Sequence, residues 1–374
     1  MNRALATLAA TALLYATFLL VLLSREQWNT SRPVMAGLPV VNRDSLPAGF
    51  AVLDDQPGYD GQYYYRLART PFTDQRIDAG IVLDAPAYRQ QRIFYPLLVR
   101  VASLGRVPLM PAAMLAVNFI AICLLGWLGG LYAQALSRHA LWGLIFPCYI
   151  GFVTSLSRDL TEIVECSLIL AALLCLRRLK YPATALLLSL AVLTKEPALL
   201  VAVGVGFADL IGDRGRLRRH TWYVAALPVA VYLLRHAWLW HNWQGQRLAA
   251  AGGIIGFPLL GFGRAAPGGL MHWHWPWVLA LLMTVILAAA VIGSIRLSLV
   301  TRWEAWSWGW YALMLFSLGI PVWQDNHAFV RAASEFTLLG SVVLLGSTQG
   351  WRNWVLGGGV VCWLGAAVQV SLKP

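Results

Sequence analysis

The sequence predicts an all-α polytopic membrane protein of about 11 transmembrane helices, and three observations support this fold class. Of the 374 residues, 59% are hydrophobic and only 12% are charged, a balance that ordinary soluble domains do not have. Apolar runs long enough to cross a bilayer recur from end to end. The 18 tryptophans gather near the ends of these runs, as interfacial aromatic belts do.

The apolar runs are expected to form a single integral membrane domain over residues 1–374, with long outer loops at about 25–107 and 239–275. The first run is longer than a signal-peptide core and lacks an A-x-A cleavage site, so it is predicted to be a retained span. The predicted spans are 4–24, 108–135, 140–156, 160–178, 181–195, 198–211, 221–238, 276–296, 303–322, 332–348 and 353–371.

Charge distribution predicts which loops share a side of the membrane. Residues 181–211 are interrupted by Lys195-Glu196-Pro197, and a proline beside two charges is expected to break a helix there. Two short segments that meet at this break put the basic clusters at 177–180 and 213–219 on one side, the cytoplasmic one. The net charge of +12 therefore indicates the positive-inside pattern and not nucleic-acid binding.

The first outer loop is too long and too aromatic for a passive connector. Two short interfacial helices are expected in it, one near Tyr63–Arg69 and an amphipathic one at Ile93–Val101. Between residues 53 and 65 it combines three aspartates, two glycines and a run of tyrosines. Glycines let the backbone approach a substrate closely, although a solvated acidic turn with interfacial tyrosines has the same composition.

Asp60 is the leading catalytic candidate in this stretch, because a carboxylate of suitable pKa can take the proton of an attacking hydroxyl. Asp54 and Asp55 are further candidates for substrate binding, with a role as hydrogen-bonded turn residues as the alternative. Gln62, Tyr63 and Tyr64 would offer amide and hydroxyl groups and flat rings to a sugar.

Charged residues at the outer ends of later spans form a second set of candidates, because charges at membrane depth are costly and mark function by default. Asp159, Glu162 and Glu165 follow at intervals of three and would share a broad helix face. The cations could hold a phosphate. The alternatives are ion pairs that lock the helices, or lysine and arginine side chains that reach the head groups. The substrate-binding candidates here are Arg158, Asp159, Glu162, Lys195, Glu196 and Arg331.

The sequence gives little support for disulfide bonds or for a metal site. The five cysteines all lie within apolar runs and form no CxxC pair, so neither a disulfide framework nor a zinc site is predicted. The spacing of Asp55 and Asp60 is not that of a compact metal motif, so no metal ligands are assigned, and a divalent cation remains an open option.

Several short motifs resemble the GT-C superfamily of membrane glycosyltransferases, in particular bacterial members distantly similar to the mannosyltransferases of the GPI-anchor pathway. The motifs are Gly58-Tyr59-Asp60-Gly61-Gln62-Tyr63-Tyr64, Arg92-Ile93-Phe94-Tyr95-Pro96-Leu97-Leu98, Ser157-Arg158-Asp159-Leu160-Thr161-Glu162 and Leu193-Thr194-Lys195-Glu196.

The resemblance implies a catalytic aspartate in the first outer loop, here Asp60, and an inverting transfer from a polyprenyl-phosphate-linked sugar to a lipid or glycan acceptor. It implies an active site on the extracytoplasmic side of a bacterial inner membrane, in envelope assembly, with Arg158, Lys195 and Arg331 as candidates for the lipid phosphate. Two other readings stay open. The intramembrane acids could line the pathway of a transporter or flippase of a lipid-linked or polar solute, or the chain could be a non-catalytic scaffold subunit.

Overall fold

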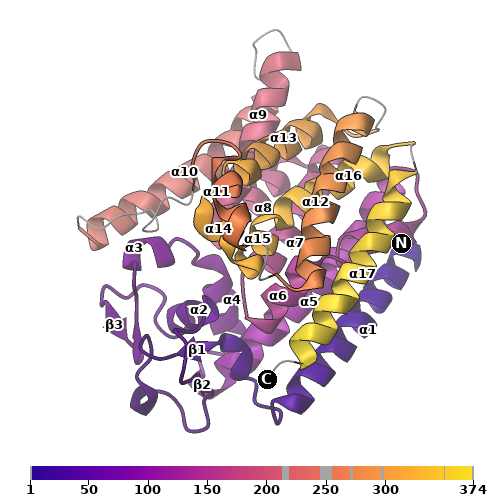
Figure 1. Ribbon diagram of the computed structural model, residues 1–374. Coiled ribbons are helices and arrows are strands. Elements are labelled where there is room, and N and C mark those ends of the chain that lie inside the picture. Colours follow the sequence, from indigo (N-terminus) through magenta and orange to yellow (C-terminus); the bar gives the residue numbers. More distant parts are fainter. Residues whose placement is uncertain are drawn as a thin grey trace.

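The computed structural model describes residues 2–212, 219–244, 255–269, 273–295, 299–348 and 350–372. It is 74% helical: a bundle of helices carries a small mixed region at one end, formed by the first loop (Figure 1). The bundle helices are α1 (Asn2–Arg25), α5 (Met110–Ala135), α6 (Ile150–Ser157), α7 (Glu162–Arg177), α8 (Tyr181–Thr194), α9 (Leu199–Gly212), α10 (Arg219–Asn242), α11 (Leu260–Gly269), α12 (Trp275–Ser294), α13 (Arg302–Phe316), α14 (Ile320–Gln324), α15 (Asn326–Ala332), α16 (Ser334–Gly346) and α17 (Trp351–Leu372).

Four of these helices, α1, α5 (with the turn that precedes it), α12 and α17, are long and apolar enough to cross a membrane, and α15 with α16 makes a fifth if that pair, bent by 45°, is one span. The predicted count of about 11 is therefore not confirmed. Two predicted spans are broken by prolines, which supply no backbone N–H to a helix. Around Pro147 a six-residue 3-10 helix and the eight-residue α6 replace the span 140–156, and α13 ends before Pro321, inside the predicted span 303–322.

The predicted break at Lys195-Glu196-Pro197 is confirmed. Helix α8 ends at Thr194 and α9 begins at Leu199, after a short 3-10 turn. The start of α8 and the end of α9 both meet the start of α10, where the Tyr181 ring stacks on His220 with centroids 4.6 Å apart and Thr221 donates a hydrogen bond to Asp209. The two short helices therefore form a hairpin that returns to the side it started from.

The opposite end from the first loop collects basic residues, as the charge pattern predicts. Arg138 and Arg352 both donate to the carbonyl of Ser347, at 2.7 and 3.1 Å, and Arg177 donates to the carbonyl of Leu299 at 3.2 Å. We call this end the basic face and the end that carries residues 26–106 the loop face. The cluster at 213–218 lies outside the described residues.

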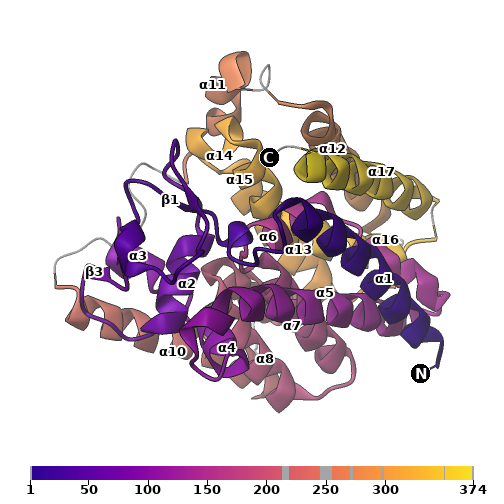
Figure 2. The ribbon, with the colours of Figure 1, turned by 90° about the horizontal axis from the view of Figure 1, so that it is seen from below.

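The first loop contains both of the short helices predicted for it. Figure 2 shows its elements gathered beside the bundle. Two small sheets complete it, with β1 and β2 parallel and β3 and β4 antiparallel. The elements are β1 (Ala36–Gly37), β2 (Val52–Leu53), α2 (Gly61–Arg69), β3 (Ile77–Asp78), β4 (Ile81–Val82), α3 (Pro86–Arg89) and α4 (Phe94–Ala102).

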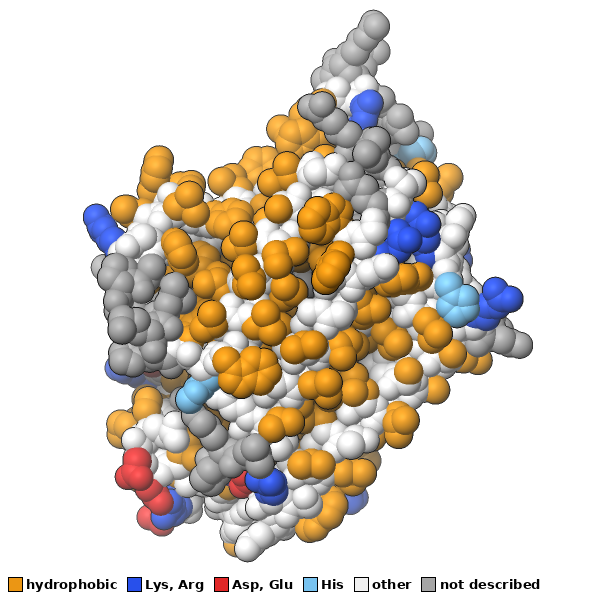
Figure 3. Space-filling model, turned by 45° about the vertical axis from the view of Figure 1, so that its right-hand side comes forward, with side chains coloured by type: hydrophobic (Ala, Val, Ile, Leu, Met, Phe, Trp, Pro, Cys, Tyr) orange, Lys and Arg blue, Asp and Glu red, His pale blue; other side chains and the backbone are white. Residues whose placement is uncertain are grey.

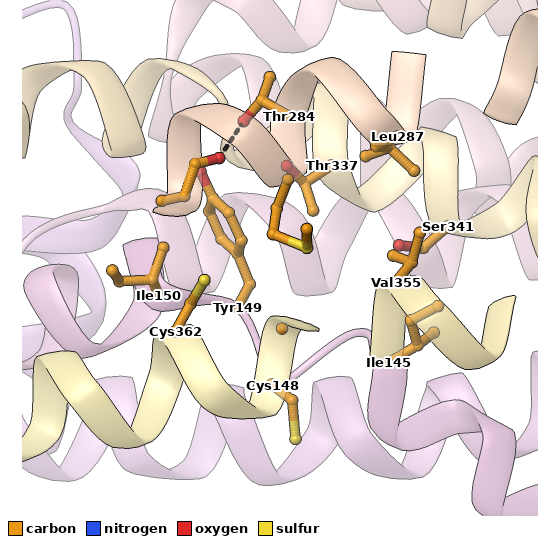
Figure 4. A pocket seen from close by; sticks show the side chains of 13 residues that line it. Ile145, Cys148, Tyr149, Ile150, Thr284, Leu287, Thr337, Ser341, Val355 and Cys362 are labelled. Carbon is orange, nitrogen blue, oxygen red and sulfur yellow. Dashed lines mark hydrogen bonds between the residues drawn. The ribbon is translucent and has the colours of Figure 1, made fainter. Parts of the chain in front are cut away.

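Surface and interior match a protein that is solvated by lipid. One side of the bundle is covered by hydrophobic side chains, with charged side chains towards its margins (Figure 3). Leu13 of α1, Leu282 of α12 and Val368 of α17 are each more than half exposed. A small internal cavity of about 40 Å³ lies among α6, α12, α16 and α17 (Figure 4). Its lining is mainly apolar, and the Thr284 hydroxyl beside it donates to a carbonyl of its own helix, so we regard it as a packing defect.

Candidate functional site

Asp60 lies at the N-terminus of α2, at a turn whose geometry requires glycine. Gly58 has φ +75°, and a Cβ on Gly61 would lie 2.5 Å from the carbonyl oxygen of Arg158. The amide of Gln62 holds the turn, because it accepts from the backbone N–H of Gly37 at 3.2 Å and donates to a carbonyl of the preceding residues at 2.9 Å. The glycines therefore allow the backbone of this turn to pack closely against the end of α6.

The Asp60 carboxylate is shared by two arginines from distant parts of the chain. Arg89 of α3 donates to Oδ1 at 2.7 Å, and Arg331 of α15 pairs with Oδ2 at 2.9 Å. Burial by itself would raise the pKa of Asp60, but the two guanidinium groups outweigh it and lower the pKa well below its ordinary value. The side chain keeps 20% of its surface exposed, so an ionised carboxylate remains accessible from one side.

A chain of ion pairs leads from Asp60 into the bundle. Arg331 also pairs with Glu162 of α7 at 3.0 Å, and Lys195 lies 3.6 Å from the same carboxylate. The Lys195 ammonium contacts Glu335 of α16 at 2.5 Å and Glu165 at 3.5 Å. All three glutamates are fully buried. The predicted shared face of Glu162 and Glu165 is therefore real, and the ion-pair alternative describes this part of the site.

A second ion pair joins the first loop to the α8–α9 hairpin. Arg92 pairs with Glu196 at 3.3 Å and donates to the hydroxyls of Tyr64 at 3.1 Å and Tyr88 at 3.2 Å. The Tyr63 ring lies under the Arg89 guanidinium, 4.1 Å from its centroid, and burial raises the pKa of Tyr63 to about 12. The tyrosines of α2 are thus placed to orient arginines, and each remains protonated at neutral pH.

Arg158 belongs to a different environment. It donates to the Ser157 hydroxyl at 3.3 Å and lies 3.0 Å from Nε2 of His327, and no carboxylate pairs with it among the described residues. Its Nε is buried without a hydrogen-bond partner there. The ring of Tyr59 lies against both Arg158 and Arg331, with centroid distances of 5.5 and 5.2 Å. One aromatic ring therefore separates Arg158 from the cation that holds Asp60.

Arg158 lines a cavity of about 380 Å³ beneath the first loop, which we call the polar cavity. Its other polar walls come from both ends of the chain and include Arg32, Glu26 and His327. The apolar walls include Leu22 and Trp277. It is much larger than the cavity of about 40 Å³ among α6, α12, α16 and α17.

The structure separates the predicted site residues into groups. Asp60, Glu162, Lys195 and Arg331 form one network, with Tyr63 and Tyr64 beside it and Glu196 in the adjoining pair. Asp54 pairs instead with Arg43 at the surface, where both side chains are more than half exposed, and Asp55 is exposed as well. Gln62 supports the turn. These three are not assembled with Asp60, because β2 ends before the turn and leaves Asp54 and Asp55 outside.

Asp159 differs from its expected place on the face of α7. It precedes the helix, in a left-handed conformation with φ +50°, so it does not continue the spacing of Glu162 and Glu165. Its carboxylate is buried, and neither oxygen has a hydrogen-bond partner among the described residues.

Sequence reasoning missed Arg89 and Glu335. Arg89 ends a short helix in a loop rich in other arginines, so nothing in the local pattern distinguishes it. Glu335 is an isolated acid near the start of an apolar run, and a charge at that depth was a signal that could have been used.

Within the described ranges, no group of three or more His, Cys, Asp or Glu side chains is arranged to hold a metal ion. All five cysteines, each inside a described range, are free thiols. The chain matches no protein-family model, no curated protein and no solved structure. The fold and site therefore define a helical protein with several helices long and apolar enough to cross a membrane and a charged centre under its first loop.

Proposed function

We propose that the chain is a membrane glycosyltransferase of the GT-C type, which transfers a sugar from a polyprenyl-phosphate donor to a lipid or glycan acceptor. The observation that carries the proposal is the pairing of an accessible carboxylate, Asp60, with a neighbouring polar cavity that presents an arginine without a carboxylate partner. A displacement of lipid phosphate by a hydroxyl requires a base and an anion-binding cation near one another, and here the Tyr59 ring contacts both Arg158 and the arginine that pairs with Asp60.

In the proposed reaction an acceptor oxygen forms a bond to the anomeric carbon, while the bond from that carbon to the phosphate oxygen breaks. The polyprenyl phosphate leaves with the electron pair, and Arg158 stabilises its charge. A carboxylate with a lowered pKa is a weak base, so Asp60 orients the hydroxyl first and takes its proton as the new bond forms and the hydroxyl becomes acidic. Two of its roughly four lone-pair positions are used by Arg89 and Arg331, which leaves room for an acceptor.

The location follows from the same proposal. Placed in a bacterial inner membrane with the basic face towards the cytoplasm, the bundle carries the site on the exterior side. Lys195 and Arg331, which the resemblance nominates for the lipid phosphate, are already surrounded by buried carboxylates. We therefore assign the phosphate to Arg158 and give the other two cations the task of holding the site together.

The test is sugar transfer from a panel of radiolabelled polyprenyl-phosphate sugars by purified protein in nanodiscs, with and without EDTA. Asp60→Asn is expected to lower turnover at least a hundredfold, the lower end of the range for general base catalysis. Asp74→Asn, an exposed aspartate of the same loop, is the matched control and keeps wild-type turnover. Full activity in Asp60→Asn would exclude the assigned role, and activity lost to EDTA would place a divalent cation in the site.

A transporter or flippase of a lipid-linked or polar solute is the second candidate, favoured by the buried, unpartnered carboxylate of Asp159. Such a group could carry a proton or a solute through the bundle. Flipping of a fluorescent lipid-linked sugar in proteoliposomes, abolished by Asp159→Asn and unaffected by Asp60→Asn, would support this function over transfer.

A further inference from the structure

An apolar groove runs along the outside of the bundle between α1 and α17. Its volume is about 530 Å³, and its walls are built mainly from Leu13, Phe18, Val21, Trp363, Leu364 and Val368. The groove extends from Ala10 to Arg25 on α1, which corresponds to about 22 Å at 1.5 Å per residue. The two helices lie side by side (Figure 1), and the edges of Tyr15 and Phe18 meet Trp363 with centroids 5.4 and 6.2 Å apart.

The groove meets the polar cavity at the loop face. Val21 and Val368 line the groove, whereas Leu22 and Val370, on the same last turns of the two helices, line the polar cavity. An apolar surface that is open to the side of the bundle therefore passes directly into a chamber of polar walls. The two spaces together have the form of a site for a molecule with a long apolar tail and a polar head.

The charge of the chamber fits an anionic head. Arg32 is balanced by Glu26, whose carboxylate lies 3.2 Å from its Nε. Arg158 has no such balance among the described residues, and its Nε is buried without a hydrogen-bond partner there. Arg25 lines the groove at its loop-face end and adds a second cation near the junction. The Arg158 guanidinium is partly buried, hydrogen-bonded to Ser157 and close to His327, but no carboxylate balances its charge among the described residues. An anion in the chamber would supply that balance, and phosphate is the anion that matches its donor geometry.

We propose that the α1–α17 groove and the polar cavity bind one polyprenyl-phosphate lipid, with the tail in the groove and the phosphate on Arg158. The groove is a single trough between two helices and suits one chain, whereas a membrane phospholipid carries two. The head would lie next to Tyr59, whose ring touches both Arg158 and Arg331, and so beside Asp60. That the lipid is the sugar donor rests on the proposed function, but the binding site itself does not.

The experiment measures equilibrium binding of a radiolabelled polyprenyl phosphate without sugar to the full-length protein in nanodiscs. Arg158→Gln removes the cation, and Val368→Trp fills the groove from a membrane-facing position that is 55% exposed, so the fold is not disturbed. Each is expected to weaken binding at least tenfold. The controls are Arg106→Gln, an exposed arginine at the start of α5, and Leu282→Trp on the membrane-facing side of α12, which is 52% exposed. Both are expected to stay within twofold of wild type.

Unchanged binding in both Arg158→Gln and Val368→Trp would overturn the proposal. Competition by phosphatidylglycerol at equal concentration would also overturn it, since the site would then be an ordinary phospholipid site. Failure of the proposed function would give a different result. If the wild-type protein binds the lipid at this site but transfers no sugar from any donor, the binding site stands and the glycosyltransferase function is rejected. Conversely, if Val368→Trp has the KM and turnover of wild type, the glycosyltransferase function stands and the groove is rejected as the binding site of the lipid tail.

Discussion

Lys195→Met tests whether the buried charges hold the bundle together. The ammonium of Lys195 is the cation nearest to Glu165 and Glu335 among the described residues, and its side chain is only 8% exposed. Methionine keeps most of the apolar stem and removes the charge. Two fully buried carboxylates are then left without their cation, and Glu162 retains only Arg331.

Breaking a buried ion pair by removing one partner costs about 3–5 kcal/mol, and the contact of Lys195 with three carboxylates favours the upper half of that range. A loss of this size lowers the melting temperature of a large domain by on the order of 10 °C. Removing the charge of Glu335 together with that of Lys195 is less costly, because only Glu165 is then left without its cation. The double variant Lys195→Met with Glu335→Gln should therefore recover at least ~2 kcal/mol relative to the sum of the single variants.

The assay is thermal unfolding in detergent, followed by the fluorescence of the 18 tryptophans. Lys180→Met is the matched control, because this lysine is exposed at the turn before α8, and its melting temperature should change little. The reasoning fails if Lys195→Met melts within ~2 °C of wild type, or if the double variant is less stable than Lys195→Met alone.

Three further outcomes are expected. The lowered pKa of Asp60 means that its ion pairs stabilise the fold above its unfolded pKa of about 3.9 and lose this contribution as pH falls towards the folded pKa. The difference in melting temperature between wild type and Asp60→Asn should therefore be constant above pH 5 and disappear below pH 3. A difference that grows in acid would contradict this reasoning. Gly61→Ala should lower the free energy of unfolding by about 1–3 kcal/mol, because the new Cβ would lie 2.5 and 2.7 Å from two backbone oxygens. Urea unfolding measures this change, and Gly49→Ala shows the effect of a positive φ alone, because a Cβ there meets no neighbouring atom. None of the five thiols should react with a membrane-impermeant maleimide before unfolding, because all lie within the bundle helices or the buried segment at Cys148. Rapid labelling of the native protein would show that one of these segments is misassigned.

Local patterns in the sequence were sufficient to predict several elements. The glycines flanking Asp60, the helix that follows them and the break before Pro197 each depend on residues within a few positions, and each was found. The gathering of basic residues at one end of the bundle was also predicted, because charge asymmetry is a property of whole loops. The predicted number of spans was not confirmed, because it depends on features that such local patterns do not contain. Hydropathy does not register that Pro147 and Pro321 interrupt backbone hydrogen bonding.

The partners of the charged residues could not be predicted, because they are set by how the helices pack. Lys195 meets Glu335 across 140 positions of sequence, and Arg92 meets Glu196 across 104. Lys195 and Glu196 are adjacent in sequence, but the extended backbone at Lys195 sends the two side chains to different elements. Asp54 and Asp55 were grouped with Asp60 only because they are close in sequence.

The contact between Asp60 and Arg331 has a consequence for biosynthesis. The two residues are about 270 positions apart, and translation adds roughly 5–20 residues per second. The first loop is therefore synthesised on the order of tens of seconds before the arginine that fixes its central carboxylate exists. During this interval Asp60 can pair only with Arg89, and the loop must wait, partly assembled, for the last helices to insert. A nascent chain truncated before α15 should thus display a protease-sensitive first loop that becomes resistant once synthesis passes Arg331.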